Sequence, residues 1–484
     1  MSRWFWVWIP LAFFVMCAGW ALTSPVGAAP DDDYHLTSIW CAQGVRTGVC
    51  EESPTDPMAR LVPRNVVQAS DCYRFDGSVS AGCTATVRND ATLVETTRVN
   101  ETVHLYPKGY YLTMSAFVGP DVEHSVLMMR LFNAAIAALL LAALLRLVPP
   151  GLAAAAVGAI AVTFIPLGVA TVSSTNPSAW TIIGIGTYWA FAVAFLRHRN
   201  WRDRRGLLLA ACTVVAAVLA MSSRVDANSY VLIATVLALT VSGWRRALHT
   251  PGRLALLAAL SIAAVITYLT VAPSAVGGEA FAETHAGAGL LLTNLAYLPV
   301  LFQGIVGGTQ LGWNDTLMPP LIPVVGVIVL GALLYRGLQQ PTRRILVTSG
   351  IAALALVAVP ITFLQMQHLG VGEVVQPRYL LPLLTLLIGV VSLGPRLAVG
   401  LNLPRVPQVL IAGGLSVSAI LAFWANAHRY FAGSGFGLFD PKVSPEWLSS
   451  TGLPLWLITI CTGAASIAFV TGVFVVFLPS ASRR

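Results

Sequence analysis

Three consecutive aspartates, Asp31, Asp32 and Asp33, follow the first apolar stretch of the chain, and His35 comes two residues later. Neighbouring carboxylates repel one another, which raises the affinity for the first proton or cation bound. Such a cluster suits a general base, with Asp31 and Asp32 as candidate catalytic residues, or a divalent cation held by oxygen ligands. Asp33 and His35 would support it. The alternative interpretation is a solvated acidic turn that only ends the helix.

Three arginines are expected at the same membrane depth as the acids: Arg130, Arg224 and Arg378. Guanidinium groups bind phosphate with paired hydrogen bonds, so we expect a cavity in which they hold an anionic lipid headgroup opposite the carboxylates. The other polar residues expected in this cavity are Asn176, Asp226, Trp313, Asp315, Tyr110 and Tyr379. The alternatives are that the arginines are unrelated interface anchors, or that Arg224 forms a local ion pair with Asp226.

The elements that must position these residues are membrane helices. The chain is 56% hydrophobic and only 10% charged, which excludes an ordinary soluble protein. Long apolar runs predict an all-α polytopic membrane protein, since only helices and closed barrels satisfy the backbone in lipid and no barrel alternation is present. Twelve spans are predicted: 4–22, 126–146, 152–172, 178–196, 206–222, 228–244, 253–272, 317–335, 345–365, 379–395, 406–425 and 454–478.

The distribution of charge predicts the orientation in the plasma membrane. With the N-terminus in the cytoplasm, arginine-rich turns such as 197–205 face inward and nearly all acids face outward, as the positive-inside rule requires. The candidate site is then extracytoplasmic. The net charge of +8 is spread over short loops, which argues against nucleic acid as a partner. A cleaved signal peptide is the alternative for the first span, because small residues follow it at 24–29.

Three regions are expected: a first transmembrane helix at 1–22, an extracytoplasmic subdomain at 23–125, and a multi-helix domain at 126–484. The subdomain should be α+β or irregular. The multi-helix domain has outer loops at 273–316 and 426–453, long enough for short interfacial or re-entrant helices.

The subdomain contains Cys41, Cys50, Cys72 and Cys83. Two disulfides are expected in an oxidising compartment, with Cys41–Cys50 and Cys72–Cys83 the simplest of three pairings. A zinc site is the alternative, although the spacings lack the C-x2-C form.

Several of these residues occur in motifs that resemble a known family. The motifs are Pro30-Asp31-Asp32-x-x-His35, Tyr106-Pro107-Lys108-Gly109-Tyr110-Tyr111, Arg130, Gly312-Trp313-Asn314-Asp315-Thr316 and Pro377-Arg378-Tyr379-x-x-Pro382. They resemble the bacterial membrane proteins catalogued as domain of unknown function 2142, and the resemblance extends over nearly the whole chain. The family usually has Asp-Glu in place of Asp31-Asp32, and Gly-Arg-Tyr in place of Pro377-Arg378-Tyr379.

The resemblance implies a GT-C-like glycosyltransferase, because this family is grouped with the GT-C enzymes. Such enzymes use polyprenyl-phosphate sugars at the extracytoplasmic face, and the acidic pair in the first outer loop carries the base. The expected reaction is an inverting sugar transfer to an envelope glycan or lipid acceptor. Membrane lipid is expected to surround the protein. Asp31 or Asp32 would deprotonate the acceptor while Arg378, helped by Arg224 or Arg130, stabilises the leaving phosphate. His35 would orient the acids or join a divalent cation.

Two other classes of function compete with this interpretation. A secondary transporter or lipid flippase is consistent with twelve spans, but such proteins place charged residues at the bilayer midplane and often contain repeats. Here the middles of the spans are nearly without charge. A non-catalytic envelope assembly protein, whose outer subdomain only binds glycan, would leave the acids and arginines apart. The positions of Asp31 and Arg378 therefore discriminate among the three classes.

Overall fold

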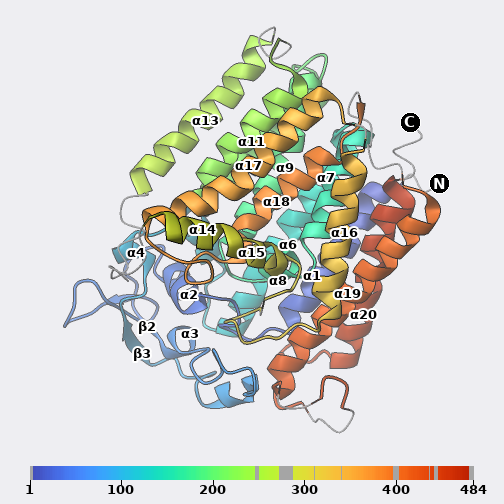
Figure 1. The fold of residues 1–484 in the computed structure, drawn as a ribbon. Helices are drawn as coiled ribbons and strands as arrows, with labels where there is room; N and C mark the ends of the chain where they lie inside the picture. Colours follow the sequence, from blue (N-terminus) through green and yellow to red (C-terminus); the bar gives the residue numbers. More distant parts are fainter. Residues whose placement is uncertain are drawn as a thin grey trace.

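A computed structural model describes residues 4–245, 250–271, 287–309, 311–339, 341–395, 403–434, 437–440 and 445–478 of the chain. The helices of the main bundle are α1 (Phe5–Leu22), α6 (Val122–Leu147), α7 (Pro150–Thr163), α8 (Leu167–Val172), α9 (Ser178–Arg197), α10 (Arg204–Met221), α11 (Asp226–Ser242), α13 (Pro251–Val271), α14 (Ala288–Tyr297), α15 (Pro299–Ile305), α16 (Leu321–Gly337), α17 (Arg343–Met366), α18 (Pro377–Val391), α19 (Arg405–Ala432) and α20 (Leu455–Thr471), which continues into the π-helical η5 (Gly472–Phe477). The segment between α1 and α6 folds against one end of the bundle (Figure 1), which we call the subdomain end.

Nine helical stretches among the described residues are long and apolar enough to cross a membrane. Eight of them fall in predicted spans, and the shorter apolar helices α7, α11, α16 and α18 fall in the other four. The ninth, Ala288–Ile305, comprises α14 and α15 and falls in the loop expected at 273–316. The fold is thus that of a multi-pass membrane protein, while the number twelve stays a prediction. Residues 273–286, 310, 435–436 and 441–444 of the two expected outer loops lie outside the described residues.

The span predicted at 152–172 is two helices rather than one. Helix α7 ends at Thr163 and α8 begins at Leu167, with Pro166 between them. Proline has no backbone N–H, and it disfavours helical geometry in the residue before it, so the helix breaks here. The short α8 then leads into the turn at 173–177, which forms part of the candidate site described below.

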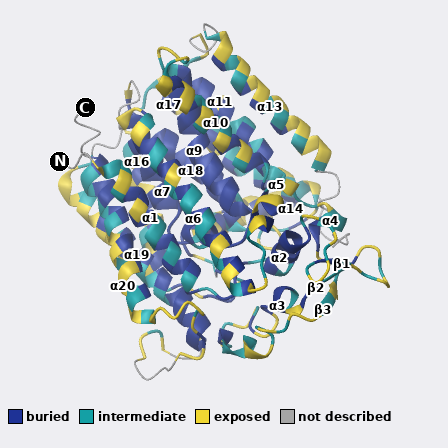
Figure 2. Ribbon diagram, turned by 180° about the vertical axis from the view of Figure 1, so that it is seen from behind, coloured by how far each residue is buried: buried dark blue, intermediate teal, exposed yellow. Residues whose placement is uncertain are grey.

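The core of the bundle is built around α9, whose apolar span is completely buried. Helices α10, α11 and α18 pack against it, while α1 packs against α6 and α20. Figure 2 shows buried residues along α9 and α18, and exposed residues along α13. The exposed side chains of α13 include Ile262, Ile266 and Leu269, as expected of a helix that contacts lipid tails.

The subdomain between α1 and α6 contains a small antiparallel sheet and short helices. Its elements are α2 (Asp32–Trp40), β1 (Glu51–Glu52), β2 (Arg60–Pro63), α3 (Arg64–Val67), η1 (Ala81–Thr86), β3 (Leu93–Thr96), α4 (Asn100–Val103), α5 (Lys108–Met114) and η2 (Ser115–Phe117). The strands are ordered β1-β2-β3, and Leu61 of β2 pairs with Glu51 and Glu95. Disulfides join Cys41 to Cys50 and Cys72 to Cys83, which are the pairings of nearest cysteines.

Candidate active site

The three neighbouring aspartates have three different environments. Asp31 has a left-handed backbone, with φ of 62°, and directly precedes α2, so that Asp32 and Asp33 occupy the first turn of that helix. The side chain of Asp31 is 37% exposed, whereas Asp32 is completely buried. Asp33 forms ion pairs with Arg74 at 3.3 Å and Arg98 at 2.8 Å. Of the three carboxylates, Asp31 is the one most accessible to a substrate.

Asp31 is paired with Arg378, which lies 347 positions further along the chain. Nη2 of Arg378 is 2.7 Å from Oδ2 of Asp31, and the Arg378 side chain is 4% exposed. Pro377 is the first residue of α18 and Arg378 the second, so the fixed φ of proline helps to place the guanidinium at the helix start. Arg378 also donates to the hydroxyl of Tyr379 and to the side chain of Gln376. A base candidate and a phosphate-binding candidate are therefore in direct contact.

The charges around the cluster set its protonation. Burial acts to raise the pKa of Asp31, but the positive charge of Arg378, assisted by Arg98, outweighs burial and lowers the pKa below its usual 3.8. Burial lowers the pKa of His35 to about 3, although Asp31 acts in the opposite direction. At neutral pH, Asp31 is thus an anion and His35 is an uncharged imidazole.

Asp32 is a buried acid with its own set of partners. The backbone N–H of Ala29 donates to Oδ2 at 3.0 Å, and the hydroxyl of Thr175 donates to Oδ1 at 2.7 Å. Burial raises the pKa of Asp32 to about 6, a rise that Arg130 and these hydrogen bonds restrain. Both oxygens of Asp32 are therefore occupied by groups of the protein, and they join the start of α2 to the turn after α8.

Arg130 lies in the wall of the site but has its terminal nitrogens engaged. Nη1 donates to the carbonyl of Ser24 at 2.5 Å, and Nη2 donates to that of Pro25 at 2.7 Å. Arg130 thus holds the turn that follows α1 and contributes a fixed positive charge. Its role as a phosphate-binding residue stays a prediction.

Arg224 lies beside Arg378, with Tyr379 between them. The guanidinium of Arg224 is 4.0 Å from the centre of the Tyr379 ring, and that of Arg378 is 5.1 Å from it. Arg224 is also paired with Asp226, at 2.8 Å and 3.2 Å between nitrogen and oxygen atoms. The local ion pair proposed from the sequence is therefore present. Arg224 also places a positive charge against the ring of Tyr379, which Arg378 contacts as well.

His35 and a group of tyrosines form the buried side of the cluster. Nδ1 of His35 is 2.9 Å from the hydroxyl of Tyr111, and Nε2 has no hydrogen-bond partner among the described residues. Tyr110 packs edge-on against Trp180, and its hydroxyl accepts a 3.3 Å hydrogen bond from Asn133. Tyr110 therefore supports the interior of the site and does not line the recess described next.

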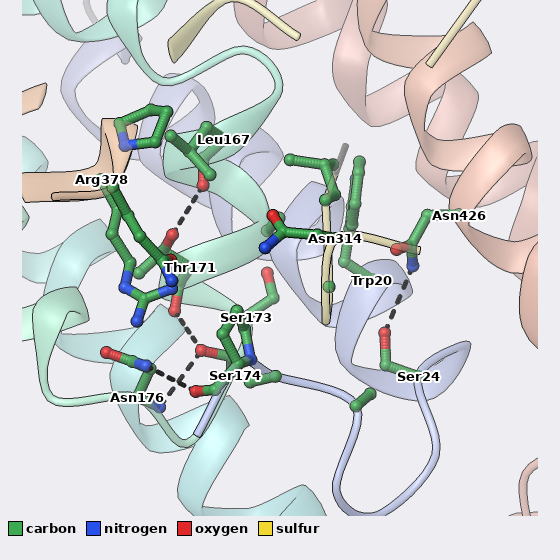
Figure 3. Close-up of a pocket in the computed structure, with 18 of the residues that line it drawn as sticks. Trp20, Ser24, Leu167, Thr171, Ser173, Ser174, Asn176, Asn314, Arg378 and Asn426 are labelled. Atoms are coloured by element: carbon green, nitrogen blue, oxygen red, sulfur yellow. Dashed lines mark hydrogen bonds between the residues drawn. The ribbon is translucent and has the colours of Figure 1, made fainter. Parts of the chain in front are cut away.

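A recess opens between the turn after α1, the turn after α8 and the start of α18 (Figure 3). It encloses about 740 Å³ of empty space, including its open mouth. Its lining residues are Trp20, Ser24, Ala28, Ala29, Pro30, Arg130, Leu167, Ala170, Thr171, Ser173, Ser174, Asn176, Thr309, Leu311, Gly312, Asn314, Gln376, Pro377, Arg378, Asn426 and Tyr430. The recess thus combines two arginines with hydroxyls, carboxamides and several apolar side chains.

Trp313 and Asp315 hold the loop at 311–316, whose residues Leu311, Gly312 and Asn314 line the recess. The indole N–H of Trp313 donates to the carbonyl of Gly27 at 2.8 Å. Asp315 is paired with Arg429 at 2.8 Å, and both of these side chains are buried. Of the polar residues expected in the cavity, Asn176 does line the recess, and its side-chain amide donates to the carbonyl of Pro30.

Several functional candidates were not singled out from the sequence. Arg429 binds Asp315 and also the carbonyls of Tyr73, Asp76 and Val79, which joins the subdomain to α19. Asn426 lines the recess from the same helix. Asn314 had a signal, since it belongs to the Gly312–Thr316 motif. No sequence signal pointed to Arg429 or Asn426, because nothing in their local spacing sets them apart from other residues near a helix end.

A cation site was considered for the acid cluster. The described part of the chain contains no group of three or more His, Cys, Asp and Glu side chains placed to hold a metal ion. Asp31 and Asp33 share Arg98, at 3.9 Å and 2.8 Å, whereas both oxygens of Asp32 are bonded to Ala29 and Thr175. The cluster itself thus offers a cation no set of three convergent ligands.

The helices and the recess together define a multi-pass membrane protein with a polar site at one end of its bundle. A family model described as "Predicted membrane protein (DUF2142)" matches residues 13–387, so the chain belongs to this family. The matched region includes every lining residue of the recess except Asn426 and Tyr430. Comparisons with curated proteins and with solved structures gave no match.

Proposed function

We propose that the protein is a GT-C-like glycosyltransferase that moves a sugar from a polyprenyl-phosphate donor to an envelope acceptor at the extracytoplasmic face. The observation that carries this proposal is the contact between Asp31 and Arg378 beside the recess. A partly exposed carboxylate and a phosphate-binding guanidinium are the two groups that an inverting transfer needs.

The lining of the recess suits a lipid-linked phosphate. Arg378 and Arg130 supply positive charge, while Leu167, Ala170 and Leu311 supply apolar surface for the first carbons of an isoprenoid. Asp31 and Arg378 lie at the starts of α2 and α18, and Arg130 lies in the N-terminal half of α6, which is the half nearer the subdomain. That placement favours chemistry at a membrane surface over passage of a charged substrate through the bilayer.

In the proposed reaction, the carboxylate of Asp31 accepts the proton of the acceptor hydroxyl. The hydroxyl oxygen attacks the anomeric carbon of the donor and forms the new glycosidic bond, with inversion. The bond from that carbon to the phosphate oxygen breaks, and its electron pair leaves with polyprenyl phosphate, whose charge Arg378 stabilises. A bound phosphate also offsets the charge of Arg378 at Asp31, so the pKa of Asp31 rises on donor binding, as a general base requires.

The test is complementation of a strain that lacks the gene, with incorporation of labelled sugar into the cell envelope as the readout. Asp31→Asn removes the base with little change in shape, and we expect incorporation to fall by about 100-fold or more. Arg378→Gln removes the phosphate contact and should give a loss of similar size. Immunoblots of the membrane fraction check that each variant accumulates.

Asp90→Asn is the matched control, because Asp90 lies in the same subdomain and pairs with Arg64 away from the recess. It should complement fully. Full complementation by Asp31→Asn would contradict the proposed mechanism, whereas loss of function in the Asp90 variant would point to folding of the subdomain.

A further inference from the structure

Asn314 lies at the tip of a tight loop between Leu311 and Thr316. These two residues pair as an antiparallel bridge, with N–H to carbonyl distances of 3.0 Å and 3.2 Å. Within the loop, Gly312 and Asn314 have positive φ values of 61° and 57°. Asparagine is one of the few residues besides glycine that tolerate this conformation, so the local backbone alone accounts for part of its presence.

The residues on both sides of Asn314 are fixed to the protein. Trp313 is held by the carbonyl of Gly27, and Asp315 is held by the buried guanidinium of Arg429. Both of these neighbours are buried. Asn314 is exposed and lines the recess.

The carboxamide of Asn314 makes no hydrogen bond with any described residue. In Figure 3 it lies between Arg378 and Thr171 on one side and Trp20 and Asn426 on the other, with no interaction drawn from it. The other carboxamides of the recess are engaged. That of Asn176 donates to the carbonyl of Pro30, that of Asn426 donates to the hydroxyl of Ser24 at 3.4 Å, and that of Gln376 accepts from Arg378.

The recess therefore has two chemically different parts. Arg378 marks the part that suits a phosphate. Trp20, Asn314 and Asn426 mark a second part with an aromatic ring and two carboxamides, where the other arginine, Arg130, has its terminal nitrogens bound to the backbone carbonyls of Ser24 and Pro25. A glycosyl phosphate has the same division, with its charge on one side and a ring of hydroxyls on the other. A carboxamide can donate to one sugar hydroxyl and accept from its neighbour, which an arginine cannot do.

We propose that Asn314 recognises the sugar of the donor, by hydrogen bonding to hydroxyls of the glycosyl ring. This inference rests on the proposed function and deepens it. The contact is to the sugar and not to the phosphate, so it determines which glycosyl group the recess accepts. Leaving a polar group of the site without its partner typically costs about a factor of ten or more in affinity.

The test compares two lipid probes on purified protein in nanodiscs. One is bare polyprenyl phosphate. The other is the tightest binder among polyprenyl-phosphate-linked glucose, mannose and arabinose. Asn314→Gly retains the left-handed backbone and removes the carboxamide, and Asn314→Asp retains the shape but removes the donor. We expect both variants to bind the sugar-linked probe about tenfold more weakly. Asn314→Gly should bind bare polyprenyl phosphate as wild type does.

His368→Gly is the control for backbone effects, because His368 is exposed and has a similar φ of 55° outside the recess. It should leave both affinities unchanged. If Asn314→Gly weakens the binding of both probes equally, the contact is to the phosphate and the inference is overturned. If it weakens the binding of neither probe, Asn314 has only a conformational role in the loop backbone, and the inference is overturned as well. Wild-type protein that binds neither probe would overturn the proposed function itself, and with it this inference.

Discussion

Asp31, Asp32 and Asp33 are adjacent in the chain yet differ in exposure and in their main partners. Asp31 is partly exposed and paired with Arg378, Asp32 is buried with both oxygens hydrogen-bonded, and Asp33 joins Arg74 and Arg98. The sequence predicted an acidic cluster with either of the first two residues as the base. It could not rank them, because their environments depend on residues far away in the chain, such as Thr175 and Arg378.

The raised pKa of Asp32 predicts a pH-dependent difference in stability between wild type and Asp32→Asn. In the unfolded chain, Asp32 ionises near its usual 3.8, whereas in the folded protein it holds its proton up to about pH 6. The acid therefore favours folding below pH 3.8, and this contribution is lost as the pH rises to about 6. In thermal unfolding experiments in detergent, the free energy of unfolding of wild type should fall by up to about 3 kcal/mol relative to that of the variant between pH 4 and pH 7. A difference that does not change with pH would contradict this account.

At the scale of single helices, the close approach of α9 and α10 depends on one glycine. A Cβ atom on Gly184 would lie 2.6 Å from the carbonyl oxygen of Ala216, so the two backbones could not keep their distance. Small residues at such crossings are common in membrane helices, where packing rather than the hydrophobic effect drives association.

Gly184→Ala should lower the stability of the protein by about 1–3 kcal/mol, because the clash is with backbone and cannot be relieved by a rotamer change. The matched control is Gly186→Ala in the same helix, where the added Cβ would meet its nearest neighbours at 3.8 Å, an ordinary contact. That change should be neutral or slightly stabilising, since alanine favours the helix over glycine. Thermal unfolding of both purified variants checks the pair, and equal melting temperatures would refute the packing argument.

The existence of the apolar helices was predictable because hydropathy is a property of each segment by itself. The residues at which these helices begin and end were less predictable. Pro166 lies inside the apolar run at 152–172, but the length and hydropathy of that run predict a single span. The sequence predicts an outer loop at 273–316 that is long enough for short interfacial or re-entrant helices. Its described part contains the short helices α14 and α15, and the stretch that they form, Ala288–Ile305, is apolar enough to cross a membrane.

At the scale of the whole molecule, the recess is built from segments spread over the chain. Residues from the turn after α1, the turn after α8, the loop at 311–316 and the start of α18 meet at the subdomain end of the bundle. The sequence placed their polar residues at one membrane depth, and from that it predicted a common cavity. It did not reveal which side chains would face the cavity. Trp313 and Asp315 were expected there, yet Asn314 between them is the residue that lines it.

The most direct test of the proposed function is a structure of the protein in lipid nanodiscs with bound polyprenyl phosphate. We expect the phosphate in the recess against the guanidinium of Arg378, beside Asp31, with the first isoprenoid carbons against Leu167 and Leu311. An empty recess, with the lipid phosphate bound elsewhere on the helical bundle, would contradict the account.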